Sequence, residues 1–338
     1  MRAAVFHGGK TLSVEEVDRP KPAHDEVLVR VAACGICRTD LHYLHGVPTF
    51  KEPPLILGHE ISGTVEEAPH GGPEIGQRVL IPPVIPCGEC EYCLQGRGTL
   101  CTHMVMLGNH RDGGFAEYVA VSQSVTFPLP DTVPLQEGCI ISDAFSTPYH
   151  AVINRAEVKP GQTVAIFGCG GVGLAAVQMA VLAGARVVAV DLVEEKLLLA
   201  EDFGAWLTIN ASGVDDAAKE VRRLTGGGAD VALEVIGNPA TIRQAFDSLR
   251  WGGRLMVIGY TDKEVSFSGA KLMFREMEVR GSLGCGLHDF PKVIDLAAMG
   301  LLKVKEMVSH RFALEDINEG FRLLETGDPG LLRGIVLL

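Results

Sequence analysis

Two patterns of apolar and polar residues follow one another along the chain. Up to about residue 150 the two kinds alternate over short stretches such as Val27–Ala33, and glycine and proline interrupt them often. This alternation is typical of a β-rich domain without long helices. From 151 to 286, short apolar strands alternate with helical segments, and the expected strands are Thr163–Phe167, Arg186–Val190, Asp230–Val235, Arg254–Gly259 and Glu278–Leu283.

Strand–helix alternation predicts a parallel sheet with right-handed crossovers. The last segment, 287–338, shows two amphipathic helical patterns near 290–300 and 315–326, followed by a terminal strand, GIVLL. We expect this strand to return to the first domain. The predicted fold class is therefore α/β: a doubly wound parallel sheet at 151–286, a β-rich domain at 1–150, and a C-terminal segment that joins the latter.

Four cysteines lie within one short segment, about 86–102, with the spacing C-x2-C-x2-C-x7-C. Zinc accepts tetrahedral sites of four thiolates, and such a closed set leaves no position for substrate. Unrelated thiols or two disulfides are the alternatives, and adjacent C-x2-C pairs make them the weaker interpretation. We therefore expect a structural zinc ion bound by Cys87, Cys90, Cys93 and Cys101.

A glycine-rich motif follows the first strand of the second domain and precedes a helical segment. A G-x-G-x-x-G motif in this context binds the pyrophosphate of a dinucleotide at the helix N-terminus. Asp191 ends the next strand, where a carboxylate accepts the ribose hydroxyls of NAD and repels the 2′-phosphate of NADP; a helix cap or a solvated carboxylate is the alternative. The cofactor-binding candidates are Asp191, Gly168, Gly170, Gly171, Val172 and Gly173.

Composition narrows the classes of protein. The 338 residues, 47% of them hydrophobic, suffice for two domains with separate cores. The formal charge of −12 disfavours nucleic acid as a partner, which requires a basic face. No apolar run is long enough to cross a bilayer, so we expect no membrane association. The remaining cysteines are scattered, and reduced thiols in a cytoplasmic protein are the simpler account.

Several motifs together resemble one family. In chain order they are CGICRTDLH, GHE, the cysteine segment, DAFSTPYHA, GCGGVG and an arginine close to the C-terminus. The chain is similar over its whole length to the zinc-dependent medium-chain alcohol dehydrogenases. This resemblance implies a GroES-like catalytic domain, a Rossmann domain, and two zinc ions per subunit, one of them catalytic.

The resemblance also implies the ligands of the catalytic zinc. They are Cys37, His59 and Asp143, with Glu60 as an occasional fourth ligand. Relatives commonly carry cysteine or glutamate at the position of Asp143, and a carboxylate preserves the anionic charge of the set. If Asp143 only caps a helix, Cys139 is the substitute ligand.

Further roles follow from the same resemblance. Thr39 accepts the alcohol proton and His42 delivers it to solvent, which suits a histidine that titrates near neutrality. Asp40 fixes the tautomer of His59. Three further residues are expected to contact the cofactor: Arg38 and Arg333 at the pyrophosphate and Thr147 at the nicotinamide.

The implied activity is reversible hydride transfer between a primary or secondary alcohol and NAD. The pocket wall is expected from Tyr43–Phe50, Pro82–Val84, Met104–Asn109 and residues around Leu283–Leu287. Three alternatives remain. The first is a specialised dehydrogenase of a polyol, cyclic alcohol, acyl-CoA or thiol adduct. The others are a zinc-independent quinone or enoyl reductase and a non-catalytic zinc-binding scaffold. The small-molecule substrate is an alcohol or carbonyl compound, and we expect a homodimer or homotetramer.

Overall fold

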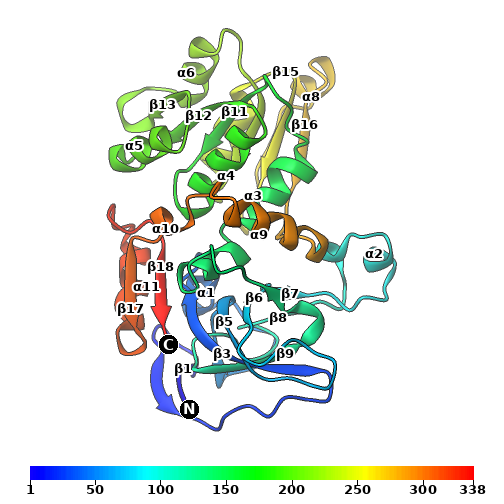
Figure 1. The fold of residues 1–338 in the computed structure, drawn as a ribbon. Coiled ribbons are helices and arrows are strands. Elements are labelled where there is room, and N and C mark those ends of the chain that lie inside the picture. The colour runs from blue at the N-terminus through cyan, green and yellow to red at the C-terminus, as the bar shows by residue number, and fades with distance from the viewer. The chain divides into compact units, whose positions relative to one another are not determined.

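The computed structural model describes residues 1–338, and these divide into two compact units (Figure 1). Unit 1 comprises Met1–Ser146 and Cys285–Leu338, and unit 2 comprises Thr147–Gly284. Each unit has its own hydrophobic core. None of the helices is both long enough and apolar enough to span a bilayer.

The main sheet of unit 1 is built around β3 (Glu26–Gly35), in which Arg30 alone is exposed. β3 pairs antiparallel with β5 (Glu60–Glu67), β9 (Tyr118–Ser122) and β18 (Gly334–Leu337). The last strand of the chain thus pairs with a strand close to its beginning. The other strands of unit 1 are β1 (Arg2–Phe6), β2 (Ser13–Glu16), β4 (Leu55–Ile56), β6 (Arg78–Ile81), β7 (Val84–Ile85), β8 (Val105–Met106), β10 (Phe127–Pro128) and β17 (His310–Ala313).

The helices of unit 1 are short and lie between strands or near the C-terminus. Both C-terminal amphipathic patterns form helices, α9 (Phe290–Ala298) and α11 (Ile317–Thr326). The first buries Phe290, Val293, Ile294 and Ala297, and the second buries Ile317, Gly320 and Phe321. The set comprises α1 (Arg38–Leu44), α2 (Glu91–Leu94), α9 (Phe290–Ala298), α10 (Val304–Met307) and α11 (Ile317–Thr326); α3 (Ser146–Tyr149) begins at the boundary of the two units.

Unit 2 contains a six-stranded sheet in the order β13-β12-β11-β14-β15-β16. All its pairings are parallel, which confirms the predicted sheet. The strands are β11 (Thr163–Phe167), β12 (Arg186–Asp191), β13 (Leu207–Asn210), β14 (Ala229–Glu234), β15 (Leu249–Val257) and β16 (Glu278–Gly281).

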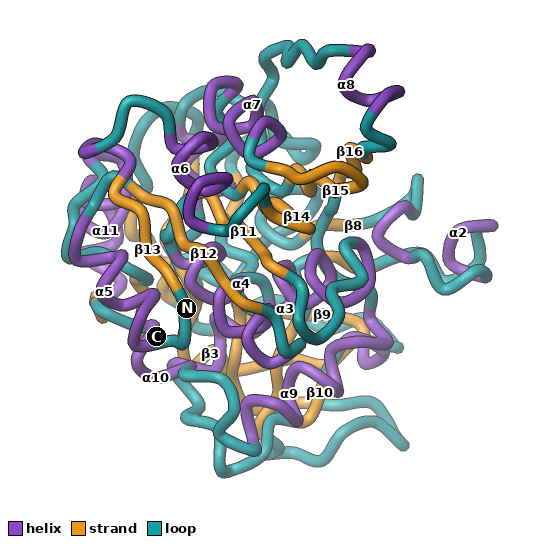
Figure 2. Tube along the Cα trace, turned by 90° about the horizontal axis from the view of Figure 1, so that it is seen from above, coloured by secondary structure: helices purple, strands orange, loops and turns teal.

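Helices pack on this parallel sheet, and Figure 2 shows its strands side by side among them. α4 packs against β11 and β12, and α7 against β14 and β15. Eight consecutive residues of α4, Gly173–Ala180, are buried, because the helix is apolar on all sides. The helices are α4 (Gly171–Leu182), α5 (Glu194–Asp202), α6 (Ala217–Leu224), α7 (Pro239–Asp247) and α8 (Gly269–Phe274).

Candidate active site

Four potential metal ligands converge in unit 1, although they come from three separate segments. Cys37 precedes α1, His59 and Glu60 stand at the start of β5, and Asp143 follows a 3-10 helix. Their ligand atoms all lie within 4.8 Å of one another. Asp143 Oδ2 lies 3.6 Å from Cys37 Sγ and 3.9 Å from His59 Nε2. Thiolate, imidazole and carboxylate in this proximity match the donor set of zinc.

The imidazole of His59 is fixed from its far side. Asp40 Oδ1 lies 3.3 Å from His59 Nδ1 and also accepts the backbone N–H of Gly58 at 3.1 Å. His59 and Asp40 are both almost completely buried. With Nδ1 held by the carboxylate, Nε2 is the nitrogen that faces Cys37 and Asp143, as in histidine ligands supported by a second carboxylate.

The electrostatic surroundings of His59 favour a cation. Burial by itself lowers the pKa of His59, but the charge of Asp40 and hydrogen bonds with Asp143, Asp40 and Cys37 raise the pKa well above its usual value. The surroundings of the ring therefore favour a positive charge at this place. A divalent metal ion competes with protons for the same ligands, so this donor set fits zinc.

Glu60 lies between the metal-ligand cluster and a buried arginine. Arg333 donates to Glu60 Oε1 in a short ion pair, and both side chains are almost completely inaccessible. Burial raises the pKa of Glu60 to about 7, although the charge of Arg333 lowers it. Glu60 Oε2 is buried without a hydrogen-bond partner. The free oxygen is consistent with a carboxylate beside a metal ion.

Cys139 does not join this cluster. Its side chain is fully buried, and burial raises the pKa of its thiol well above the usual value. The four-residue set whose ligand atoms approach one another contains Asp143 and not Cys139. The geometry thus favours the carboxylate over the alternative thiolate.

Helix α1, which follows Cys37, carries four of the expected residues: Arg38, Thr39, Asp40 and His42. Thr39 Oγ1 lies 3.7 Å from Cys37 Sγ, next to the cluster. Burial, followed by the charges of Arg38 and His45, lowers the pKa of His42. One short helix therefore holds a hydroxyl at the cluster and, three residues further on, an imidazole whose neutral form is favoured.

The four cysteines of residues 87–101 form a second cluster. Their sulfur atoms lie within 4.8 Å of one another, with Cys90 and Cys93 3.5 Å apart and Cys101 and Cys87 also 3.5 Å apart. All nine cysteines of the chain are free, so no disulfide forms. Backbone hydrogen bonds lower the pKa of Cys87 to about 6. A thiol that ionises near neutrality is ready to bind zinc.

The glycine-rich loop of unit 2 has the geometry that a dinucleotide requires. Gly168 adopts φ +101°, which side chains rarely tolerate, and a Cβ on Gly173 would lie 1.8 Å from the carbonyl oxygen of Gly168. A Cβ on Gly170 would meet no atom within 4 Å, so the space in front of this residue is open. α4 begins at Gly171 and includes Val172 in its first turn.

Asp191 supports this loop through three hydrogen bonds from backbone N–H groups. One carboxylate oxygen accepts the N–H of Cys169 at 2.6 Å, and the other accepts those of Leu192 and Val193 at 2.8 and 3.0 Å. The carboxylate therefore joins the end of β12 to the glycine-rich turn.

The other expected cofactor contacts lie in different environments. Arg38 is exposed, Thr147 is 9% exposed, and Arg333 is 7% exposed in its pair with Glu60. The pairing of Arg333 with Glu60 is not visible in the sequence, because 273 residues separate the partners.

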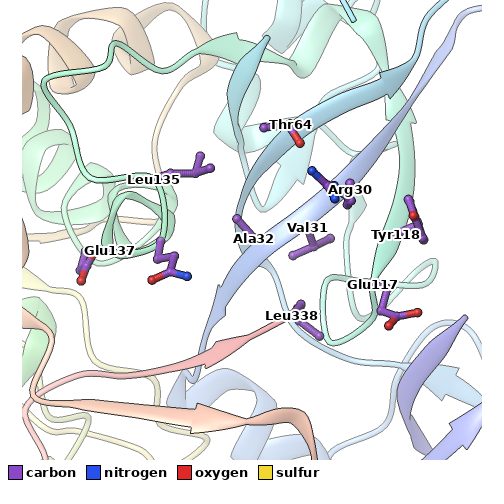
Figure 3. Close-up of a pocket in the computed structure, with 10 residues that line it drawn as sticks. Arg30, Val31, Ala32, Thr64, Glu117, Tyr118, Leu135, Glu137 and Leu338 are labelled. Atoms are coloured by element: carbon purple, nitrogen blue, oxygen red, sulfur yellow. The ribbon is translucent and has the colours of Figure 1, made fainter. Parts of the chain in front are cut away.

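A separate cavity of about 670 Å³ opens in unit 1 (Figure 3). None of its lining residues belongs to either cluster of metal ligands. It is lined by Arg30, Val31, Ala32, Thr64, Glu117, Tyr118, Leu135, Gln136, Glu137 and Leu338. The cluster around His59, and not this cavity, thus brings together the side chains with catalytic chemistry.

The fold and the two clusters define a class of protein: a zinc-type dehydrogenase with GroES-like and Rossmann-like parts. The chain matches the family descriptions "Alcohol dehydrogenase GroES-like domain" over residues 23–131 and "Zinc-binding dehydrogenase" over residues 171–299. It belongs to the zinc-type medium-chain dehydrogenase/reductase family.

Individual relatives are similar to this chain along its whole length. An alcohol dehydrogenase of Geobacillus stearothermophilus is 39% identical over 97% of this chain and 96% of its own. The alcohol dehydrogenase structure of Aeropyrum pernix superimposes with a TM-score of 0.91 at 34% identity and covers 100% of both chains. A zinc-binding dehydrogenase of Sinorhizobium meliloti solved with NADP has the same TM-score and identity and covers 100% of this chain and 99% of its own.

Proposed function

We propose that the protein is a zinc-dependent alcohol dehydrogenase that transfers hydride reversibly between an alcohol and NAD. The observation that carries this proposal is the convergence of Cys37, His59 and Asp143 in one buried cluster. Three protein ligands leave a position for substrate, unlike the closed four-cysteine set. When bound there, zinc supplies Lewis-acid activation of the substrate oxygen.

The residues of the cluster and of α1 balance the charge of the ion, orient its histidine ligand and transfer the proton. Cys37 and Asp143 supply two negative charges, which balance a divalent ion. Asp40 orients His59, and Thr39, next to Cys37, accepts the alcohol proton. His42, which favours its neutral form, passes that proton to solvent.

The four-cysteine cluster is proposed to hold a second, structural zinc ion. On the same family resemblance, Arg38, Thr147 and Arg333 are proposed cofactor contacts, together with the glycine-rich loop and Asp191. Glu60 is proposed as an occasional zinc ligand, since one of its oxygens has no partner in the buried site.

A substrate panel tests the proposed activity. Purified protein is incubated with NAD and primary, secondary, cyclic and aromatic alcohols, and NADH is followed by absorbance. Turnover of at least one alcohol is expected, and it should disappear when zinc is removed by chelation and return when zinc is restored. Turnover that survives complete loss of zinc would contradict the proposal.

The pH profile tests the role of His42. Because the pKa of His42 is lowered, its neutral, proton-accepting form is already populated below pH 6.5. Alcohol oxidation should therefore show a rising limb with a midpoint below that pH. In His42→Gln this limb should vanish and kcat near pH 7 fall about tenfold. An unchanged limb in the variant would exclude His42 from proton release.

The cofactor preference tests Asp191. In the unmodified protein we expect kcat/KM for NAD to exceed that for NADP by about a hundredfold, because the carboxylate repels a 2′-phosphate. Asp191→Ala should lower the efficiency with NAD about tenfold and raise that with NADP. Asp202→Ala, which removes an exposed carboxylate from the following helix α5, is the matched control. Equal use of both cofactors by the unmodified protein would refute the assignment.

The edge strand β16 supports a proposal about assembly. β16 pairs with β15 on one side only, and Val279 on it is 38% exposed. An exposed strand edge is a template for pairing with a second copy. We expect a homodimer or homotetramer by light scattering, and a smaller species for Val279→Lys. A monomer at micromolar concentration would contradict this proposal.

A further inference from the structure

The cavity of unit 1 lies on the main sheet, at a place where β3 changes its neighbour (Figure 3). β5 follows one edge of β3, while β9 and β18 share the other edge. Just before β9, the carbonyl of Glu117 accepts the backbone N–H of Val31 at 2.9 Å. Just after β18, Leu338 donates its N–H to the carbonyl of Ala32 at 3.3 Å. These four residues line the cavity, which therefore opens where one neighbouring strand begins and the other ends.

A row of three polar side chains crosses the sheet at this cavity. Arg30 of β3 is the direct partner of Thr64 on β5 and of Tyr118 on β9. Directly opposed residues project from the same face of a sheet, and all three line the cavity. Figure 3 shows the guanidinium of Arg30 beside the hydroxyl of Thr64. The row thus offers the donors of a guanidinium and of two hydroxyls to one ligand.

Arg30 has no acidic partner within the protein. The two acidic residues of the lining, Glu117 and Glu137, have arginine partners of their own, Arg2 at 3.5 Å and Arg311 at 2.5 Å. The ion pairs and side-chain hydrogen bonds of the structure do not include Arg30. An acidic group of a bound molecule can therefore pair with this guanidinium.

The lining also contains apolar surface next to this row. A β-bulge in β3 leaves Ala32 as an extra residue without a partner on β5. Bulges re-aim a side chain and are frequent near functional sites, and the side chain here is a single methyl group. Leu135 and Leu338 add further apolar surface. The cavity of about 670 Å³ has the size of a small-molecule site, with polar donors and an apolar wall.

We propose that this cavity binds a small organic acid, namely a monocarboxylate with an apolar tail. Its carboxylate accepts hydrogen bonds from Arg30 and Thr64. Its tail lies against Ala32, Leu135 and Leu338. A guanidinium pairs with a planar carboxylate through two parallel hydrogen bonds, whereas a phosphate dianion calls for more than one unpaired cation. The cavity shares no residue with the metal-ligand clusters, so the acid is bound there and not converted.

Calorimetric titration of the zinc-loaded protein with hexanoate tests this inference. Hexanamide, which has nearly the same shape but no charge, is the reference ligand. We expect saturable binding of hexanoate with a Kd of about 1 mM or below. Hexanamide should bind about tenfold more weakly, because the charge-assisted pair is lost. In Arg30→Gln the affinity for hexanoate should fall about tenfold, to that of the amide. Arg322→Gln, which removes an exposed arginine from α11 in the same unit, is the matched control and should bind like the unmodified protein.

Three results would overturn the inference. They are unchanged hexanoate binding in Arg30→Gln, equal affinities for hexanoate and hexanamide, and no saturable binding of hexanoate up to about 10 mM. Ala32→Leu fills the cavity beside the row and should also weaken binding. It replaces Arg30→Gln if that variant does not fold, and unchanged binding in it would equally contradict the site. Because the readout is binding and not turnover, the titration is independent of the proposed alcohol oxidation.

Discussion

Replacing Asp143 by alanine should lower kcat/KM for alcohol oxidation by about a thousandfold or more. The change removes one of three proposed protein ligands and one of the two negative charges that balance the ion. Lewis-acid activation contributes several kcal/mol to catalysis, and each 1.36 kcal/mol corresponds to a factor of ten in rate. Zinc content should fall toward one ion per subunit, measured by atomic absorption beside the NADH assay.

Two further variants make this prediction specific to the carboxylate. Asp143→Cys keeps an anionic ligand and should keep two zinc ions with measurable turnover. Cys139→Ala removes the neighbouring buried thiol and should keep kcat/KM within a few-fold. Loss of zinc from Cys139→Ala, with retention in Asp143→Ala, would reverse the ligand assignment.

Replacing Cys90 by serine should destabilise unit 1 strongly. Cys90 Sγ lies 3.5 Å from Cys93 Sγ in the four-cysteine cluster, and this cluster lies in a segment with little secondary structure. Structural zinc contributes about 10 kcal/mol in small zinc modules. We expect a loss of several kcal/mol and a fall in Tm of roughly 10 °C or more.

The control for this variant comes from the same segment. Leu94 is 77% exposed, so Leu94→Ser removes an apolar side chain without touching the ligands. It should leave Tm and zinc content nearly unchanged. If Cys90→Ser kept both zinc ions and the Tm of the unmodified protein, a structural zinc at this cluster would be ruled out.

The parallel sheet was largely predictable, because its strands are apolar runs between helical segments. One strand, β13 (Leu207–Asn210), was missed in the sequence. Only Ile209 of its four residues is buried, and threonine and asparagine occupy half of it. An edge strand of this kind lacks the continuous apolar run that identifies its neighbours.

Site residues could be predicted from the sequence where the residues that form a motif lie close together in the chain. The residues of the four-cysteine cluster lie in one short segment, so their spacing alone indicates a metal site. Asp143 depended on the family resemblance, and the structure brings its carboxylate to within 3.6 Å of Cys37 Sγ. The contact of Tyr43 with Asn109 joins residues 66 positions apart and has no signature in the sequence. Such long-range polar pairs depend on the tertiary fold, which residue patterns describe poorly.

A crystal structure of the zinc-loaded protein with anomalous data at the zinc edge tests the central claim most directly. The account predicts two peaks per subunit. One should lie about 2.0–2.3 Å from Cys37 Sγ, His59 Nε2 and an Asp143 oxygen, and the other within the four-cysteine cluster. Absence of the first peak from protein that oxidises alcohols, or a peak bound by Cys139 in place of Asp143, would contradict the account.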